Sequence, residues 1–177
     1  MLRFRAVQPE DIAAICRFPD TAEALYFMFP KARFPLDPAV LAEAIAARFS
    51  PTVALRGDAE SGVGDADGVD GTICGFANFH ARDADGTCAI GNVIVDPKAR
   101  GMGVAKRLIA EMIAVAATRY NAPRVRAACF NANAAGLLLY AGLGFTPYAI
   151  EQRKDPMGGR VALIHMARAI ETGESQG

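Results

Sequence analysis

Hydrophobic and polar positions along the chain follow two different periods, and the alternation between them predicts a mixed α/β fold. Residues of alternating or β-branched apolar character predict strands, and apolar residues spaced three or four apart predict helices. The predicted strands are Leu2–Val7, Thr52–Arg56, Thr72–His80, Cys88–Val95, Val125–Phe130, Tyr148–Arg153 and Arg160–Ala169. The predicted helices are Pro9–Phe18, Asp37–Phe49, a long helix from Val104 and a short helix after Asn133.

The passage from the predicted strand Cys88–Val95 into the long helix carries the strongest chemical signal. Val93, Ile94 and Val95 predict the end of a buried strand, and the turn Arg100-Gly101-Met102-Gly103 leads into the helix that begins near Val104. The first amides of a helix have no partner within the helix, and the helix dipole favours an anion there. The two glycines allow positive φ and Arg100 adds a fixed charge, so the turn predicts a phosphate-binding loop. The simpler interpretation is a glycine-rich turn that binds nothing.

A second informative segment follows the strand that ends at Phe130. Asn131 and Asn133 are predicted to cap a short helix, and Leu137 to Leu139 are predicted to form its buried face. Tyr140 lies seven residues, about two helical turns, after Asn133, so both side chains can point toward the same groove. Gly142 and Gly144 are predicted to end the helix.

Taken together and in this order, these residues resemble the GNAT superfamily of acyl-CoA-dependent N-acetyltransferases. The matching positions are Val95-Asp96-Pro97, Arg100, Gly103, Ala105, Asn133, Tyr140 and Leu143-Gly144-Phe145, within about residues 87 to 146. The resemblance implies an α/β (α+β) fold: a mixed, mostly antiparallel, twisted sheet of about seven strands, with splayed central strands, flanked by about four helices. It also implies a single N-acetyltransferase domain over residues 1–170, followed by a flexible tail at 171–177.

The resemblance implies acetyl-CoA as the acyl donor, with no metal. The backbone of Val93, Ile94 and Val95 would pair with the pantetheine arm, and Asn133, with Asn131 beside it, would contact the cofactor near its thiol end. The pyrophosphate would bind the turn made of Arg100, Gly101, Met102, Gly103, Val104 and Ala105. Gly91, inside the same strand, is either a bulge that splays two parallel strands or a simple packing glycine.

Acetyl transfer to an amine needs a proton donor for the departing thiolate, and Tyr140 matches the family position for this role. A phenol with a pKa near 10 is close in acidity to an alkyl thiol, so it can protonate the sulfur. A backbone N–H near Val93–Val95 is predicted to stabilise the oxyanion. On helix position alone, a core tyrosine with one hydrogen bond is the simpler interpretation of Tyr140.

The general base is the point at which the sequence departs from the family. The two predicted central strands, TCAIGNVIV and RVRAACF, contain no carboxylate. His80 is the nearest titratable candidate, although an exposed histidine at a strand end is the simpler interpretation. His165 is expected to face solvent. The reaction can also proceed without a protein base, if water removes the proton from a small neutral fraction of the amine.

The resemblance places the amine acceptor against the N-terminal third of the chain. The segment EALYFMFPKARFPLDP contains Tyr26, Phe27, Met28, Phe29 and Phe34, which predict either an apolar pocket wall or a cover over the core. A pocket would suit a small molecule with an apolar part, or an amino acid or peptide, better than a lysine-rich protein tail. Glu23 is the predicted partner of the acceptor's ammonium group.

The composition of the chain restricts its binding partners and its cellular compartment. The chain has 177 residues, 52% of them hydrophobic, and a formal net charge of +0, so nothing predicts binding to nucleic acid or to an anionic membrane. Cys16, Cys74, Cys88 and Cys129 lack metal-ligand spacing and predict free thiols in a reducing compartment. The chain shows neither a signal peptide nor a membrane span, which predicts a cytoplasmic protein, either monomer or homodimer. Cys129 leaves a covalent acyl-cysteine route conceivable, although direct transfer is favoured.

Parts of the sequence are also compatible with functions other than catalysis. A protein of this fold can bind acyl-CoA as a non-catalytic sensor, and the missing strand carboxylate keeps that alternative open. A domain for ATP or NAD is disfavoured because no lysine follows the last glycine of the turn and no third glycine follows in the helix. Arg56-Gly57-Asp58 and the aspartates at 65, 67 and 70 resemble adhesion and calcium motifs, but the calcium loop lacks its distal glutamate.

Overall fold

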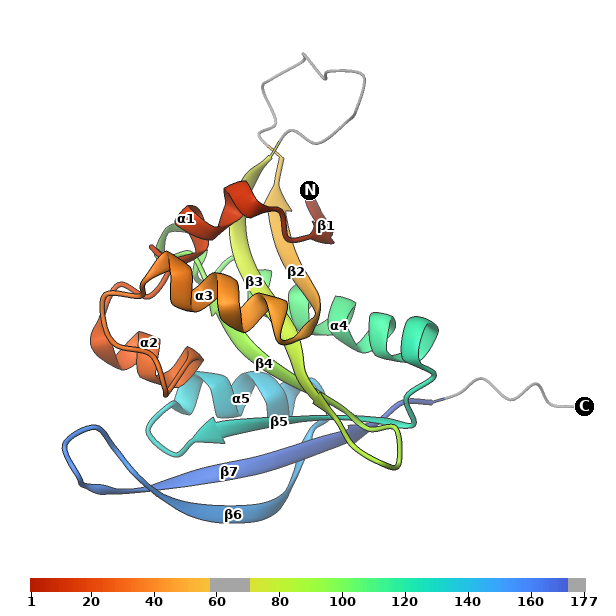
Figure 1. Ribbon diagram of the computed structural model, residues 1–177. Helices are drawn as coiled ribbons and strands as arrows, with labels where there is room; N and C mark the ends of the chain where they lie inside the picture. The colour runs from red at the N-terminus through yellow and green to blue at the C-terminus, as the bar shows by residue number, and fades with distance from the viewer. Residues whose placement is uncertain (58–70, 172–177) are drawn as a thin grey trace, which may run out of the picture. The chain divides into compact units, whose positions relative to one another are not determined.

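A computed structural model describes residues 1–57 and 71–171 and contains a seven-stranded sheet (Figure 1). Its strands are β1 (Leu2–Ala6), β2 (Phe49–Arg56), β3 (Thr72–Arg82), β4 (Cys88–Val95), β5 (Arg124–Phe130), β6 (Thr146–Lys154) and β7 (Arg160–Ala169). The strand order is β1-β2-β3-β4-β5-β7-β6. β1 with β2, β5 with β7 and β6 with β7 pair antiparallel, whereas β4 pairs with β5 in parallel. The predicted mixed, mostly antiparallel sheet is therefore confirmed. The predictions for residues 58–70 and 172–177 lie outside the described residues.

Five α-helices and two short 3-10 helices accompany the sheet in the described part of the chain. The α-helices are α1 (Ile12–Ile15), α2 (Ala22–Met28), α3 (Pro38–Ala46), α4 (Val104–Tyr120) and α5 (Ala134–Gly142). The 3-10 helices are η1 (Pro9–Asp11) and η2 (Pro97–Ala99). The α/β prediction is confirmed, and α2 is a helix that the hydrophobic pattern missed because its seven residues span only two turns.

The chain divides into two compact units. The first unit comprises Met1–Asn78 and Asn92–Ile109, and the second comprises Phe79–Gly91 and Ala110–Gly177. β3 and β4 contribute residues to both units.

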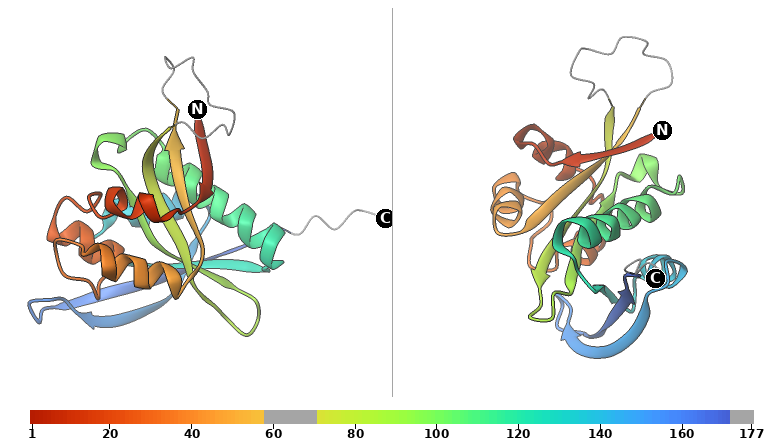
Figure 2. Two further views of the ribbon diagram at one scale, coloured as in Figure 1. Left: turned by 45° about the horizontal axis from the view of Figure 1, so that its top comes forward. Right: turned by 90° about the vertical axis from the view of Figure 1, so that its right-hand side faces the viewer.

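In the first unit, the three N-terminal helices cover one face of the sheet. Ile15, Leu25 and Leu41 of α1, α2 and α3 pack with Val53, Phe76 and Ile94 of β2, β3 and β4. The first turns of α4 lie on the opposite face, which Figure 2 shows in its right-hand view. A Cβ on Gly75 of β3 would lie 3.1 Å from Val104, so glycine there lets α4 approach the sheet closely. The turn before α4 is therefore held by packing on β3.

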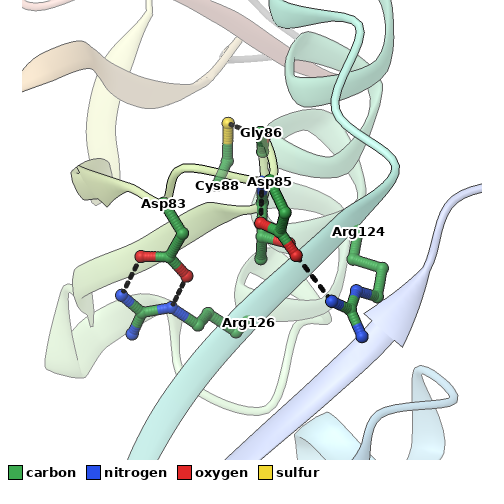
Figure 3. A network of polar contacts seen from close by, with 7 residues as sticks. Asp83, Asp85, Gly86, Cys88, Arg124 and Arg126 are labelled. Atoms are coloured by element: carbon green, nitrogen blue, oxygen red, sulfur yellow. Dashed lines mark hydrogen bonds and ion pairs between the residues drawn. The ribbon is translucent and has the colours of Figure 1, made fainter.

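In the second unit, the parallel ladder between β4 and β5 is short. It pairs Cys88 with Val125 and Ala89 with Arg126, at the first residues of β4 and near the start of β5. Two ion pairs lie beside it, Arg126 with Asp83 at 2.7 Å and Arg124 with Asp85 at 2.6 Å (Figure 3). The arginines flank Val125 on β5, and the aspartates lie in the β3–β4 connection. The ion pairs thus fix the amino-terminal end of the parallel pair.

Two predicted helices are shorter in the structure, and local chemistry explains both. The helix predicted over Pro9–Phe18 becomes η1 followed by the four-residue α1. The buried carboxylate of Asp11 accepts hydrogen bonds from Arg5 and from the Gln8 N–H, which ties this segment to β1, and Pro19 disfavours helix at Phe18. The helix predicted through Phe49 ends at Ala46, because Phe49 begins β2 and Ser50 has a φ of 45°.

Candidate active site

The glycine turn before α4 has the backbone that an anion site requires. Gly101 and Gly103 have φ values of 79° and 74°, and no atom lies within 4 Å of a Cβ built on either. Both glycines are exposed, and the Arg107 N–H donates back to the Gly103 carbonyl as α4 begins. The amides of the first helical turn precede that bond and have no place in the helical ladder. The turn is therefore open and fits the diphosphate of a nucleotide-bearing cofactor.

Arg100 and Met102 project from this turn and have partners in the first unit. Arg100 forms a two-point ion pair with Asp20, with Nη2 to Oδ1 at 2.9 Å and Nη1 to Oδ2 at 3.2 Å. Hydrogen bonding from Arg100 lowers the pKa of Asp20, so the carboxylate is ionised at neutral pH. Arg56 Nη1 donates to the Met102 sulfur at 3.3 Å. Arg100 is half exposed, so a ligand in solution can reach the guanidinium.

The irregular residue of β4 is Asn92 rather than Gly91. Asn92 has a φ of 50°, which bends the strand just before Val93, whereas a Cβ on Gly91 would lie 2.8 Å from the His80 ring. Of the two interpretations of Gly91, the geometry favours the packing glycine, which makes room for His80, and the positive φ lies at Asn92. Beyond the bend, the Ile94 side chain packs into the core.

Asn92 is also the centre of a buried chain of amide hydrogen bonds. Its Nδ2 donates to the Met28 carbonyl at 2.9 Å, and its Oδ1 accepts from Asn78 Nδ2 at 3.1 Å. The Met28 carbonyl can only accept, so it fixes the orientation of the Asn92 amide and, through it, that of Asn78. Asn78 is 0% exposed, and its Oδ1 has no hydrogen-bond partner in the described residues. This chain fixes the C-terminal end of α2 to the bend of β4.

Replacement of Asn92 by alanine should destabilise the fold through two separate effects. The Met28 carbonyl and the Asn78 amide would each be left unpaired in the interior, and the positive φ would also be strained. We expect Asn92→Ala to lower the free energy of unfolding by about 2–4 kcal/mol. Asn92→Gly should lose about 1 kcal/mol less, because glycine accepts the backbone conformation. Urea unfolding monitored by circular dichroism measures both.

Asn121 provides the matched control for this prediction. It has a φ of 48°, is exposed, and lies in the connection between α4 and β5. Asn121→Ala should therefore show the backbone effect alone, about 1 kcal/mol. Equal stability losses for Asn92→Ala and Asn121→Ala would contradict a structural role for the amide chain.

The predicted acceptor residues on and after α2 differ in their surroundings. Glu23 is exposed and Tyr26 is partly buried, with its ring centre 6.2 Å from that of Phe27. Phe29 is 9% exposed, belongs to the core cluster and lies under the Arg48 guanidinium. The Phe29 ring is thus used in packing. Of the three predicted acceptor residues, Glu23 is exposed and Tyr26 is half-buried, and Phe34 of the same segment is also exposed.

In the second unit, α5 begins at Asn133 and carries Tyr140. Asn133 Oδ1 accepts from the Gly136 N–H at 3.0 Å, as a helix cap does. Asn131 is not a second cap, because its Oδ1 accepts from the Ala162 N–H of β7. The predicted buried face also differs: Leu138 is 74% exposed, and the buried residue of the helix is Tyr140. The reason is that Leu137 to Leu139 span almost a full turn and cannot share one face.

Two ionisable groups of this unit have strongly shifted pKa values. Burial raises the pKa of Cys129 to about 11, and the Cys129 thiol donates to the Asn133 carbonyl. Burial, together with the neighbouring Cys129, raises the pKa of Tyr140 well above its usual value. The Tyr140 ring packs edge-on against Phe145, with ring centres 5.2 Å apart. Both groups therefore stay protonated and neutral across the physiological pH range.

His80 and His165 occupy different surroundings from those predicted. His80 is exposed, but it lies within β3, which continues to Arg82, rather than at a strand end. His165 is only about one-fifth exposed and pairs with Glu151, Nε2 to Oε2 at 3.1 Å, rather than facing solvent. The four cysteines are free thiols, as predicted.

The structure groups the candidate residues by unit. Glu23, Tyr26 and Phe29 belong to the first unit together with the cofactor segment Val93–Ala105. His80, Asn131, Asn133 and Tyr140 belong to the second unit. Sequence reasoning missed Asp20, Asn78 and Asn92. For the two asparagines a signal existed, since a polar residue inside an apolar strand run is a buried group that needs partners.

Two absences concern the described part of the chain. Within residues 1–57 and 71–171, no group of three His, Cys, Asp or Glu side chains is placed to hold a metal ion. In the same residues, no helix has the length and apolar character needed to cross a membrane.

Comparison with known proteins agrees with this fold. Residues 22–145 match the acetyltransferase (GNAT) family. The fold is similar to the ribosomal-protein-S18-alanine N-acetyltransferase of Escherichia coli, with a TM-score of 0.71 and 20% identity over 99% of this chain and 98% of that one. It is similar to the spermidine N-acetyltransferase of Vibrio cholerae, solved with CoA and spermine, with a TM-score of 0.73 and 16% identity over 95% of each chain.

A third similar structure was solved with acetyl-CoA bound. The fold is similar to yncA of Salmonella typhimurium, solved with its cofactor acetyl-CoA, with a TM-score of 0.69 and 22% identity over 100% of this chain and 98% of that one. A search of curated proteins finds no match.

The fold and the family match over residues 22–145 define an acetyltransferase. The chain belongs to the acetyltransferase (GNAT) family and is an acetyl-CoA-dependent N-acetyltransferase.

Proposed function

We propose that residues 1–170 act as one N-acetyltransferase domain that acetylates the amine of a small molecule, amino acid or peptide by direct attack in a ternary complex. The observation that carries the proposal is the turn at Gly101 and Gly103, whose positive φ values and open surroundings suit a diphosphate. Acetyl-CoA would supply the activated acetyl thioester. Arg100 to Ala105 would hold its diphosphate, and the backbone of Val93 to Val95 would hold its pantetheine arm.

The short β4–β5 ladder supports the pantetheine assignment. Ile90 and Gly91 of β4, and Ala127 and Ala128 of β5, lie beyond its two residue pairs. A parallel pair that stops early leaves backbone N–H and C=O groups on both strands available to another chain-like ligand. Pantetheine carries two amides that match such a row. In this proposal Asn131 and Asn133 lie near the thiol end.

The chemistry needs a proton donor, and Tyr140 is the group we assign. Its raised pKa keeps the phenol protonated, so it can donate a hydrogen bond to the sulfur as negative charge develops there. Transfer of the proton then requires that the same buried surroundings also disfavour the charge of the thiolate and so raise the pKa of the thiol. A backbone N–H among Val93 to Val95 would stabilise the oxyanion. On the acceptor side, Glu23 would bind the ammonium group beside Tyr26, with Phe29 packed in the core behind them, and His80 would accept a proton directly or through water.

The state of Cys129 favours direct transfer over an acyl-cysteine route. With a pKa of about 11, on the order of one thiol in ten thousand is thiolate at neutral pH, so Cys129 is a poor nucleophile. Mass spectrometry after incubation with acetyl-CoA checks this point. Direct transfer predicts an unmodified protein, whereas a gain of one acetyl group on Cys129 would support the covalent route.

A screen of amine acceptors tests the function. Purified protein is mixed with acetyl-CoA and with primary amines, polyamines, amino acids or peptides with a free amino terminus, and the release of free thiol is followed. We expect one amine class to accelerate thiol release well above the rate without acceptor. If acetyl-CoA binds but no class accelerates release, the non-catalytic sensor becomes the better description.

A further inference from the structure

The helix α2 is attached at both ends to the segment that carries the cofactor-binding residues. Before its first turn, Asp20 forms the two-point ion pair with Arg100 of the glycine turn. At its last residue, the Met28 carbonyl accepts from Asn92 at the bend of β4. Leu25 and Met28 also pack in the core, whereas Glu23 near the start of α2 is exposed, so the Asp20 contact is the polar attachment of the N-terminal end.

The two contacts differ in how easily a ligand or solvent can replace one of the partners. Met28 and Asn92 are buried, at 4% and 6% exposure, and their bond is continued by Asn78. Asp20 and Arg100 are each nearly half exposed, so water and ions can replace either partner at little cost. The C-terminal end of α2 is therefore a fixed point, and its N-terminal end is held by a contact that a ligand can break.

A phosphate group is the ligand best suited to break this contact. The guanidinium of Arg100 presents paired N–H donors, and a phosphate accepts such a pair in the same geometry as a carboxylate. Gly101 and Gly103 place open backbone amides beside Arg100 for the same anion. Asp20 and a bound diphosphate would thus compete for one set of donors.

We propose that Asp20 is a positioning residue that occupies Arg100 until the cofactor's diphosphate displaces it, so that cofactor binding releases the N-terminal end of α2. This inference rests on the proposed function, because it assigns the turn to acetyl-CoA. Its consequence concerns the acceptor: Glu23 and Tyr26 lie on α2, so the acceptor side is rearranged only after the acyl donor has bound. The Asp20 contact would thus couple binding at the glycine turn to the position of the α2 residues.

Calorimetric titration with CoA tests the competition. Asp20→Asn keeps the size of the side chain but removes its charge, and we expect it to tighten CoA binding roughly two- to five-fold. Glu43→Gln is the matched control, because Glu43 is an exposed carboxylate on α3, and its affinity should equal that of the wild type. In an Arg100→Gln background, Asp20→Asn should leave the affinity unchanged, since the shared donor is gone.

Amide hydrogen exchange distinguishes this positioning role of Asp20 from a purely structural one. The Ala24 and Leu25 amides both donate to Thr21, next to Asp20. We expect CoA to raise exchange at these two amides in the wild type, and expect Asp20→Asn to show the raised rate without CoA. Weaker or unchanged CoA binding by Asp20→Asn, with normal binding by the wild type, overturns this inference and leaves the proposed function standing. No CoA binding by the wild type overturns both.

Discussion

Tyr140→Phe should lose at least about 100-fold in kcat while keeping its affinity for CoA, because a positioned proton donor contributes on the order of 10²-fold or more. The phenylalanine ring keeps the edge-on contact with Phe145, so the fold should be retained. Steady-state thiol release measures kcat, and calorimetry measures CoA affinity. Tyr120→Phe is the control, since Tyr120 packs its ring edge-on against Phe79 at the end of α4. A Tyr140→Phe variant with wild-type kcat would remove Tyr140 from the catalytic group.

The pH dependence of kcat is a second test of Tyr140 as the proton donor. Burial, and then Cys129, raises the pKa of Tyr140, so the phenol keeps its proton to about pH 10 or above. The wild type should therefore show no falling alkaline limb in kcat below that pH. A limb below about pH 9 that disappears in Tyr140→Phe would contradict a raised phenol pKa.

Alanine at Gly101 or Gly103 should weaken CoA binding by roughly ten-fold or more, which is about 1.4 kcal/mol of binding free energy. The reason is not crowding within the protein, since no atom lies within 4 Å of the added Cβ. Each φ is positive, so the substitution strains the turn, and the methyl group also occupies the space in which the diphosphate would lie. Calorimetric titration with CoA measures the loss.

Gly158 provides the control that shows whether the loss of CoA affinity is specific to the glycine turn before α4. It has a φ of 84°, and no atom lies within 4 Å of a Cβ built there, but it lies in the connection between β6 and β7. Gly158→Ala should therefore show the same backbone strain with unchanged CoA affinity. If the three alanine variants bind CoA equally well, the turn is not the diphosphate site.

The sequence predicted the fold well where one local signal determines the structure. The switch of period at Val104 marks the first residue of α4, and the apolar run from Cys88 to Val95 is β4 as observed. The glycine turn was predicted correctly because positive φ at Gly101 and Gly103 is a property of residue type. Strand limits such as Thr146 and Lys154 were missed by one or two residues, which is the usual uncertainty of element ends.

The parts that sequence reasoning missed depend on contacts between distant positions. Asp20 and Arg100 are 80 residues apart, and Met28 and Asn92 are 64 apart, so no local pattern joins them. The sequence left Gly91 open between a bulge and a packing glycine, whereas the structure places positive φ at Asn92 and packs His80 against Gly91. The Asn92 side chain holds that conformation through Met28 and Asn78, which only the packed structure brings near.

Titration of the wild-type protein with CoA in a calorimeter is the most direct test, because every assigned role presupposes that this chain holds the diphosphate at residues 100–105. We expect saturable binding at one site per chain, lost or strongly weakened in the Gly101 and Gly103 variants and retained in Gly158→Ala. Absence of heat at millimolar CoA, or binding that none of the turn variants alters, would contradict the account.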